Sequence, residues 1–122
     1  MRPFILLVED DPAQRLLYTA WLKPLAYPIQ TAENGLQALQ ILLAARPALL
    51  LLDKNMPQMG GLELLRRIRT AKQWQDVRVI LFTVSPEDIP EADRALADAI
   101  VAKPTTSATL KHVVQEALVG LG

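Results

Sequence analysis

Short apolar runs alternate with helical patterns along this 122-residue chain. Continuous apolar runs are typical of strands buried on both faces, whereas apolar positions three or four residues apart are typical of helices that cover a core. The runs predict strands over residues 4–8, 48–52, 77–82 and 99–102, with a more alternating strand nearer an edge over 28–32. Helical patterns lie over residues 12–23, 35–45, 61–72 and 107–119, and another helix starts between Pro86 and Pro90 and ends near residue 99.

Strand and helix thus follow one another five times, with no repeat, linker or low-complexity segment. Such alternation requires right-handed crossovers, which give a parallel sheet with helices on both faces. The sequence therefore predicts an α/β fold, a doubly wound, flavodoxin-like (βα)5 three-layer sandwich formed by one domain over residues 1–122. A common strand order for five units is 2-1-3-4-5, which opens a ligand crevice at the carboxyl ends of the first and third strands.

Acidic residues follow the two strands that border this expected crevice. Glu9 and Asp10 come after the first strand in LVEDDP, and Asp53 closes LLLLD. Asp11 precedes Pro12, a pairing typical of a helix N-cap and first helical residue, so we interpret Asp11 as a cap. Each of the other acids, taken singly, fits a solvated loop or turn about as well. The predicted topology nevertheless brings Glu9, Asp10 and Asp53 to one spot.

Carboxylates gathered in this way need protons or a bound cation. Two of them about 4 Å apart repel by about 4 kcal/mol at an effective dielectric constant near 20, and three such pairs rival a typical domain stability of about 5–15 kcal/mol. Oxygen ligands around a small site suit Mg²⁺, which also favours a phosphate oxygen. Zinc fits less well, because the chain has no cysteine and a single histidine, His112, expected at the surface of the last helix.

Two further strand ends carry candidate chemistry. Thr83 closes the fourth strand in FTVSP, and Lys103 follows the fifth in AKPT. Alone, each is better explained as a strand residue and as an exposed cation. Together with the acids they provide what phosphoryl transfer to a carboxylate needs: Asp53 as nucleophile, with the metal, Lys103 and Thr83 stabilising charge on the transferred group.

Composition narrows the class of protein. Lys plus Arg and Asp plus Glu both number 13, so the formal net charge is zero and there is no bulk attraction to nucleic acid or anionic membrane. The absence of cysteine excludes disulfides, and the N-terminus MRPFILLVED resembles neither a signal peptide nor a membrane span. We expect a cytoplasmic protein without direct nucleic-acid or membrane contact. Trp74 and the basic run RRIR (66–69) are expected at its surface.

Five segments resemble the receiver domains of response regulators in two-component signalling. They are ILLVEDDP, TAENGLQAL, LLLLDKNMPQMGGLELLRRIR, ILFTVS and IVAKP, in that order over nearly the whole chain. The resemblance implies that Asp53 is the phosphoacceptor, Thr83 the switch hydroxyl and Lys103 the partner of the phosphorylated carboxylate. It implies Mg²⁺ as cofactor, with ligands from the first and third strand ends: Glu9 through water, Asp10, Asp53 and the backbone carbonyl of Asn55. Gly60 and Gly61 would allow a tight turn into the third helix.

The same resemblance implies a signalling cycle. A sensor histidine kinase or histidine phosphotransfer protein supplies the phosphoryl group, and the new charge draws Thr83 inward. The face formed by the fourth helix, fifth strand and fifth helix then shifts and signals to an output partner. We expect a monomer or weak homodimer, either a stand-alone regulator or a receiver from a longer one. It would be no enzyme beyond catalysing its own phosphorylation and slow dephosphorylation.

Some positions depart from the family pattern. Ile100 stands three residues before Lys103, where Tyr or Phe usually provides an aromatic switch, and Val84 replaces the small residue usual after Thr83. The segment between Thr83 and Lys103 is slightly short, so the fourth helix is expected to be short or irregular. These departures favour an alternative, an interaction module that regulates with little or no phosphorylation. An aspartate-dependent phosphatase is disfavoured, because Asn55 replaces the acid such enzymes use.

Overall fold

The computed structural model describes residues 3–119. Its strands are β1 (Ile5–Val8), β2 (Ile29–Ala32), β3 (Leu49–Asp53), β4 (Arg78–Thr83) and β5 (Ala99–Ala102). Its α-helices are α1 (Pro12–Leu22), α2 (Gly35–Ala44), α3 (Gly61–Thr70), α4 (Glu91–Arg94) and α5 (Ser107–Leu118). All strand pairs are parallel, in the order β2-β1-β3-β4-β5. The predicted doubly wound (βα)5 fold with sheet order 2-1-3-4-5 is confirmed.

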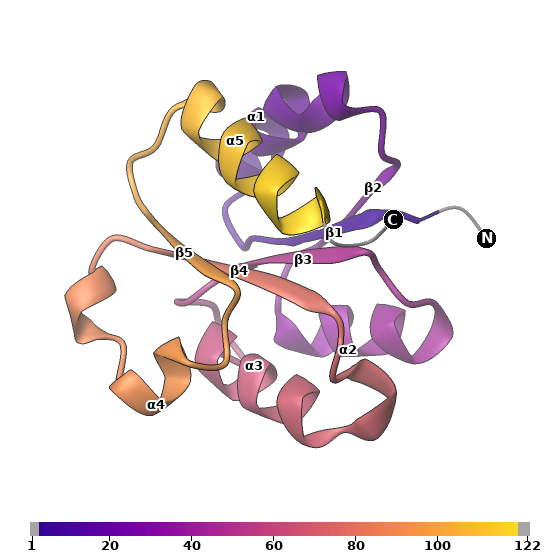
Figure 1. Cartoon of the computed structure of the whole chain (residues 1–122), viewed down its shortest axis with the longest axis vertical. Helices are drawn as coiled ribbons and strands as arrows, with labels where there is room; N and C mark the ends of the chain where they lie inside the picture. Colours follow the sequence, from indigo (N-terminus) through magenta and orange to yellow (C-terminus); the bar gives the residue numbers. More distant parts are fainter. Residues whose placement is uncertain (1–2, 120–122) are drawn as a thin grey trace.

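The sheet lies between two helical layers. Helices α1 and α5 cover one face, and α2, α3 and α4 cover the other (Figure 1). Successive strand residues point to opposite faces, so Ile5 and Leu7 pack into the core under α1 and α5, while Leu6 and Val8 pack into the core over α2 and α3. Because each face is buried, β1 and β3 read as continuous apolar runs.

Some side chains lie elsewhere than their sequence pattern indicates. Trp74 was expected at the surface, but it is only 7% exposed and belongs to the core over α2 and α3. It ends η2 (Lys72–Trp74), a single 3-10 turn whose hydrogen bonds redirect the chain after α3 and return the indole to the core, where its large apolar area is removed from water. Helix α1 conversely exposes Leu16 (75%) and Leu17 (44%).

The segment before β5 is irregular, as its prolines predicted. A 3-10 turn, η3 (Pro86–Asp88), precedes Pro90, and α4 then contains only four residues. Its N-cap is Pro90, whose side chain cannot accept a capping hydrogen bond. The expectation of a short fourth helix is confirmed, but the helix begins after Pro90 and ends at Arg94, not near residue 99. A helix of this length has little stability of its own, so side-chain contacts must hold it.

Two arginines of the run RRIR provide those contacts. The Arg66 side chain is exposed, as expected, whereas the Arg69 side chain is only 16% exposed, so the expectation of a solvated run is wrong for Arg69. The Arg66 guanidinium donates to both carboxylate oxygens of Asp93, from Nε to Oδ1 at 2.8 Å and from Nη2 to Oδ2 at 2.7 Å. Arg69 donates from Nε to the carbonyl of Leu96 at 2.8 Å and from Nη2 to Asp98 Oδ2 at 3.1 Å. Helix α3 thereby fastens α4 and the chain that leads into β5.

We expect Asp93→Asn to lower the melting temperature by about 4 °C at pH 7, because Asp93 is only 4% exposed and loses its bidentate partner. The hydrogen bonds from Arg66 hold the pKa of Asp93 below its usual value. A lowered folded-state pKa means that this stabilisation is present above the unfolded pKa of about 4 and is lost as the pH falls through the folded value. Thermal melts from pH 7 to pH 3 should therefore show that the difference in melting temperature between wild type and Asp93→Asn becomes smaller as the pH falls.

Glu63→Gln provides a matched control on the same helix. Glu63 forms an exposed ion pair with Arg67 (Nη2 to Oε2, 3.3 Å), which should contribute little to stability. The assigned role of the Arg66–Asp93 pair would be contradicted if Asp93→Asn and wild type had the same melting temperature at pH 7, or if their difference stayed constant down to pH 3.

Within residues 3–119, none of the helices combines the length and the apolar character that crossing a membrane requires.

Candidate functional site

The carboxyl ends of β1 and β3 bring three acidic side chains together. Val8 and Leu52 are register partners in the parallel β1–β3 pair, so Glu9 and Asp53, the next residues, emerge at the same sheet edge. Glu9, Asp10 and Asp53 each offer a carboxylate oxygen, and these oxygens all lie within 4.8 Å of one another. Glu9 and Asp53 are buried, while Asp10 is exposed to solvent.

This cluster fits a small, hard cation. Partial desolvation raises the pKa of Asp10 above its usual value, and the hydrogen bond and negative charge of Glu9 raise it further. The cluster thus resists carrying its full negative charge without a counter-ion. Carboxylate oxygens at this spacing, with one side open to water, suit Mg²⁺, which retains several waters when bound. Asn55 donates its backbone N–H to Asp53 Oδ1 at 3.3 Å, and the role of its carbonyl as a ligand stays a prediction.

Lys103 points into the same cluster from the end of β5. Its Nζ lies 2.8 Å from Glu9 Oε1 and 3.4 Å from Asp53 Oδ2. Burial by itself would lower the pKa of Lys103, but the hydrogen bond to Glu9 and the charges of Asp53 and Glu9 raise it above its usual value. The Lys103 side chain therefore remains a positively charged ammonium beside the carboxylates. Its backbone N–H donates to the Thr83 carbonyl at 2.8 Å, and the Lys103–Pro104 peptide bond is cis.

Thr83 lies at the end of β4, the neighbour of β3, and is buried. Its hydroxyl Oγ1 accepts a hydrogen bond from the backbone N–H of Ser85 at 3.0 Å. The hydroxyl oxygen thus accepts from the loop after β4, and within residues 3–119 the hydroxyl makes no hydrogen bond to Asp53. Val84, which comes next, is 65% exposed at the rim beside Lys103.

The two glycines before α3 differ in what the fold demands of them. A Cβ on Gly61 would lie 2.3 Å from the carbonyl oxygen of Asp53 and 2.8 Å from the Cα of Lys54, so only glycine allows this close approach. Gly60 has ordinary backbone angles, and a Cβ there would make only an ordinary van der Waals contact, 3.5 Å from the carbonyl oxygen of Lys54. The expected need for glycine thus holds at Gly61 but not at Gly60, and the left-handed residue of this loop is Gln58 (φ 69°).

Helix α1 contributes two residues that sequence reasoning missed. Gln14 Oε1 accepts a hydrogen bond from Lys103 Nζ at 2.8 Å. Arg15 Nη1 donates to the backbone carbonyls of Glu9 (2.8 Å) and Asp10 (3.3 Å), which holds the loop after β1. Asp11 is confirmed as the N-cap, with its Oδ1 accepting from the N–H of Ala13 at 2.9 Å. The Asp11 cap was the feature of the sequence that could have pointed to Gln14 and Arg15. It starts α1 at this place, and side chains one turn into a helix point back toward its N-terminus, here toward the end of β1.

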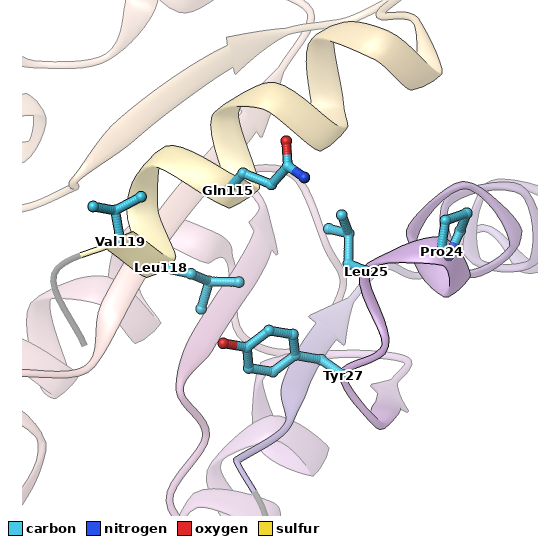
Figure 2. Close-up of a pocket in the computed structure, with 6 residues that line it drawn as sticks. All are labelled: Pro24, Leu25, Tyr27, Gln115, Leu118 and Val119. Carbon is cyan, nitrogen blue, oxygen red and sulfur yellow. The ribbon is translucent and has the colours of Figure 1, made fainter. Parts of the chain in front are cut away.

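A surface pocket lies away from this cluster. It has a volume of about 430 Å³ and lies between the end of α5 and the chain that joins α1 to β2 (Figure 2). Its lining is mostly apolar: Pro24, Leu25, Tyr27, Gln115, Leu118 and Val119. The joining chain precedes β2, so the cavity lies toward the amino ends of the strands, opposite the acids. It plays no part in the chemistry of the cluster.

Comparisons with known proteins agree with this geometry. The Regulator of RpoS from Escherichia coli (strain K12) is 36% identical over 100 residues, which are 82% of this chain and 30% of that protein. This chain therefore spans less than a third of that relative. Chemotaxis protein CheY-3 from Vibrio cholerae serotype O1 is 34% identical over 111 residues, covering 88% of this chain and 85% of that protein.

Solved structures and a family model point the same way. The response regulator protein TrrA from Thermotoga maritima, in complex with Mg²⁺-BeF, superposes with a TM-score of 0.86 at 34% identity, covering 95% of this chain and 99% of that one. The family model for the response regulator receiver domain matches residues 5–115. With its fold and acidic cluster, the chain belongs to the response regulator receiver domain family of two-component signalling.

Proposed function

We propose that this receiver domain takes a phosphoryl group from a histidine kinase or a histidine phosphotransfer protein onto Asp53. The observation that carries the proposal is the convergence of Glu9, Asp10, Asp53 and the Lys103 ammonium at one sheet edge. A carboxylate nucleophile flanked by a fixed cation and a set of hard-oxygen ligands is the arrangement that phosphoryl transfer to an aspartate requires.

The proposed reaction is an in-line displacement. An oxygen of Asp53 attacks phosphorus, the phosphorus–nitrogen bond of the donor phosphohistidine breaks, and the imidazole leaves with the electron pair of that bond. Mg²⁺ held by Glu9, Asp10, Asp53 and the Asn55 carbonyl would neutralise charge on the transferred group. Lys103, whose Nζ lies 3.4 Å from Asp53 Oδ2, would supply a second positive charge beside the transferred group.

Signalling would follow from the rearrangement of polar groups around the new phosphate. We propose that the Thr83 hydroxyl, whose oxygen accepts from the Ser85 N–H, donates its O–H to a phosphoryl oxygen, and that α4, β5 and α5 then shift for an output partner. Ile100 offers no aromatic rotamer switch on this face, so the loop after β4 would carry more of the change. The catalytic action of the chain would be limited to its own phosphorylation and slow dephosphorylation.

A second candidate is an interaction module that regulates without regular phosphorylation. The observation favouring it is that α4 contains four residues and is fastened to α3 through Arg66 and Asp93, which restricts the movement expected of an output face. The complete set of site residues favours the first candidate. For either one we propose a cytoplasmic, monomeric or weakly dimeric domain over residues 1–122.

Uptake of one phosphoryl group from a small acyl phosphate in the presence of Mg²⁺ is the expected result for the first candidate. Intact-mass spectrometry at timed intervals measures it directly. Addition of a chelator in excess over Mg²⁺ should slow the uptake by at least about tenfold, since the three carboxylates would then meet the anionic donor with only the Lys103 ammonium to offset their charge. An unchanged mass with several acyl and amido phosphate donors would favour the interaction module.

A further inference from the structure

Three acceptors from three separate elements surround the ammonium of Lys103. Its Nζ lies 2.8 Å from Glu9 Oε1 after β1, 2.8 Å from Gln14 Oε1 on α1 and 3.4 Å from Asp53 Oδ2 on β3. The contacts to Glu9 and Gln14 are hydrogen bonds and the contact to Asp53 is an ion pair, so Gln14 is one of the two hydrogen-bond acceptors of this ammonium. The Lys103 side chain is only 11% exposed, which leaves little room for water to replace a missing acceptor.

Gln14 is itself held in place by its neighbours on α1. Its Nε2 donates to Asp11 Oδ2 at 3.3 Å, and the hydroxyl of Tyr18 donates to its Oε1 at 3.4 Å. Tyr18 is buried and stacks on Phe82 of β4, with ring centroids 5.2 Å apart and planes 9° from parallel. The amide of Gln14 therefore presents its oxygen to Lys103 from a fixed position, with Asp11 on one side and Tyr18 on the other.

The acceptor on α1 is neutral, and the other two are carboxylates. Without it, the ammonium would keep Glu9 as its only hydrogen-bond acceptor of the present two, and it would be free to move, either outward to solvent or onto the Asp53 oxygen now 3.4 Å away. A closer contact would occupy one of the two Asp53 carboxylate oxygens, of which the proposed attack on phosphorus needs one free. A carboxylate in place of the amide would hold Lys103 as well, but would add charge to a cluster that already contains three acids.

We propose that Gln14 is a positioning residue, which holds the Lys103 ammonium beside Asp53 without letting it close on the nucleophile. Its effect on the reaction rests on the proposed function, whereas its hold on Lys103 does not. The two parts can therefore be tested separately with Gln14→Met, which keeps the length of the side chain and removes the acceptor. Gln14→Glu restores an acceptor oxygen, and Gln40→Met makes the same exchange at an exposed position of α2.

The hold on Lys103 is measured by timed labelling with an amine-acylating reagent, read residue by residue by mass spectrometry. We expect Gln14→Met to raise labelling of Lys103 about fivefold relative to Lys111 in the same molecules, because the amine loses one of its partners. Gln14→Glu should restore the slow labelling, and Gln40→Met should leave it unchanged. A purely structural defect would raise labelling of other lysines too and would not be rescued by Glu.

The effect on the reaction is measured by phosphoryl uptake with Mg²⁺ and an acyl phosphate. We expect Gln14→Met to slow uptake about fivefold while the protein stays folded at the assay temperature, which a thermal melt of the variant checks. Unchanged labelling of Lys103 would overturn the whole inference. If Gln14→Met labels faster at Lys103 but takes up phosphate at the normal rate, the proposed effect on the reaction is overturned. If wild type itself takes up no phosphate, the proposed function is overturned, while faster labelling in Gln14→Met would still support the hold on Lys103.

Discussion

Asp53→Asn should abolish uptake of a phosphoryl group from an acyl phosphate. The amide oxygen of Asn is a far weaker nucleophile than a carboxylate, so we expect a loss of at least about 100-fold, which is complete on the timescale of the assay. Asn has nearly the same shape and its oxygen can still accept the N–H of Asn55, so the site should keep its form. Intact mass before and after incubation gives the result.

The melting temperature of Asp53→Asn should also rise less than that of wild type when magnesium is added. A cation that binds only the folded state raises the melting temperature, and Asp53→Asn removes one of the three carboxylates that would hold it. Asp76→Asn is the matched control, since Asp76 is an exposed acid just before β4, at the opposite end of the sheet. Continued uptake of phosphate by Asp53→Asn, at any residue of the cluster, would show that Asp53 is not the acceptor.

Gly61→Ala should be the most damaging addition of a single methyl group near the site. The new Cβ would lie 2.3 Å from the carbonyl oxygen of Asp53 and 2.8 Å from the Cα of Lys54, and backbone atoms cannot turn aside as a side chain can. Either α3 or the Asp53 loop must move, so we expect a loss of about 1–3 kcal/mol in the free energy of unfolding. Alanine stabilises a helix by about 1 kcal/mol relative to glycine, so the steric clash has to outweigh this gain for Gly61→Ala to be destabilising.

Gly60→Ala separates close contact from the general effect of losing a glycine. Its Cβ would meet nothing nearer than 3.5 Å, and its backbone angles suit any residue, so we expect a change within about 0.5 kcal/mol. Urea denaturation measures both variants, and phosphoryl uptake should fall only in Gly61→Ala because only there does Asp53 shift. Equal stability of the two variants would show that α3 and the Asp53 loop are not packed as closely as described.

The elements of the fold could be predicted because their causes are local. A strand covered on both faces has to be apolar at every position, so β1, β3 and β4 were visible as runs. The meeting of Glu9, Asp10 and Asp53 was predictable for a related reason: parallel strands in the order 2-1-3 bring their carboxyl ends to one edge.

Contacts between side chains far apart in the chain could not be predicted in the same way. Lys103 meets Gln14 across 89 positions, and Arg66 meets Asp93 across 27. Each pair depends on where two elements settle against each other and on which rotamers fit there, and neither leaves a periodic signal. Trp74 and Gly61 are similar, since burial of the one and the close contact of the other depend on the path of a neighbouring loop.

The sequence by itself determined the order of strands and helices and the edge at which the acids gather, because hydrophobic periodicity and crossover handedness act on every residue of an element at once. Only the tertiary structure decided how the Lys103 ammonium is shared, how the short α4 is held and which of Gly60 and Gly61 has to be glycine. Those outcomes depend on distances of a few ångströms between single atoms, which packing sets and composition does not encode.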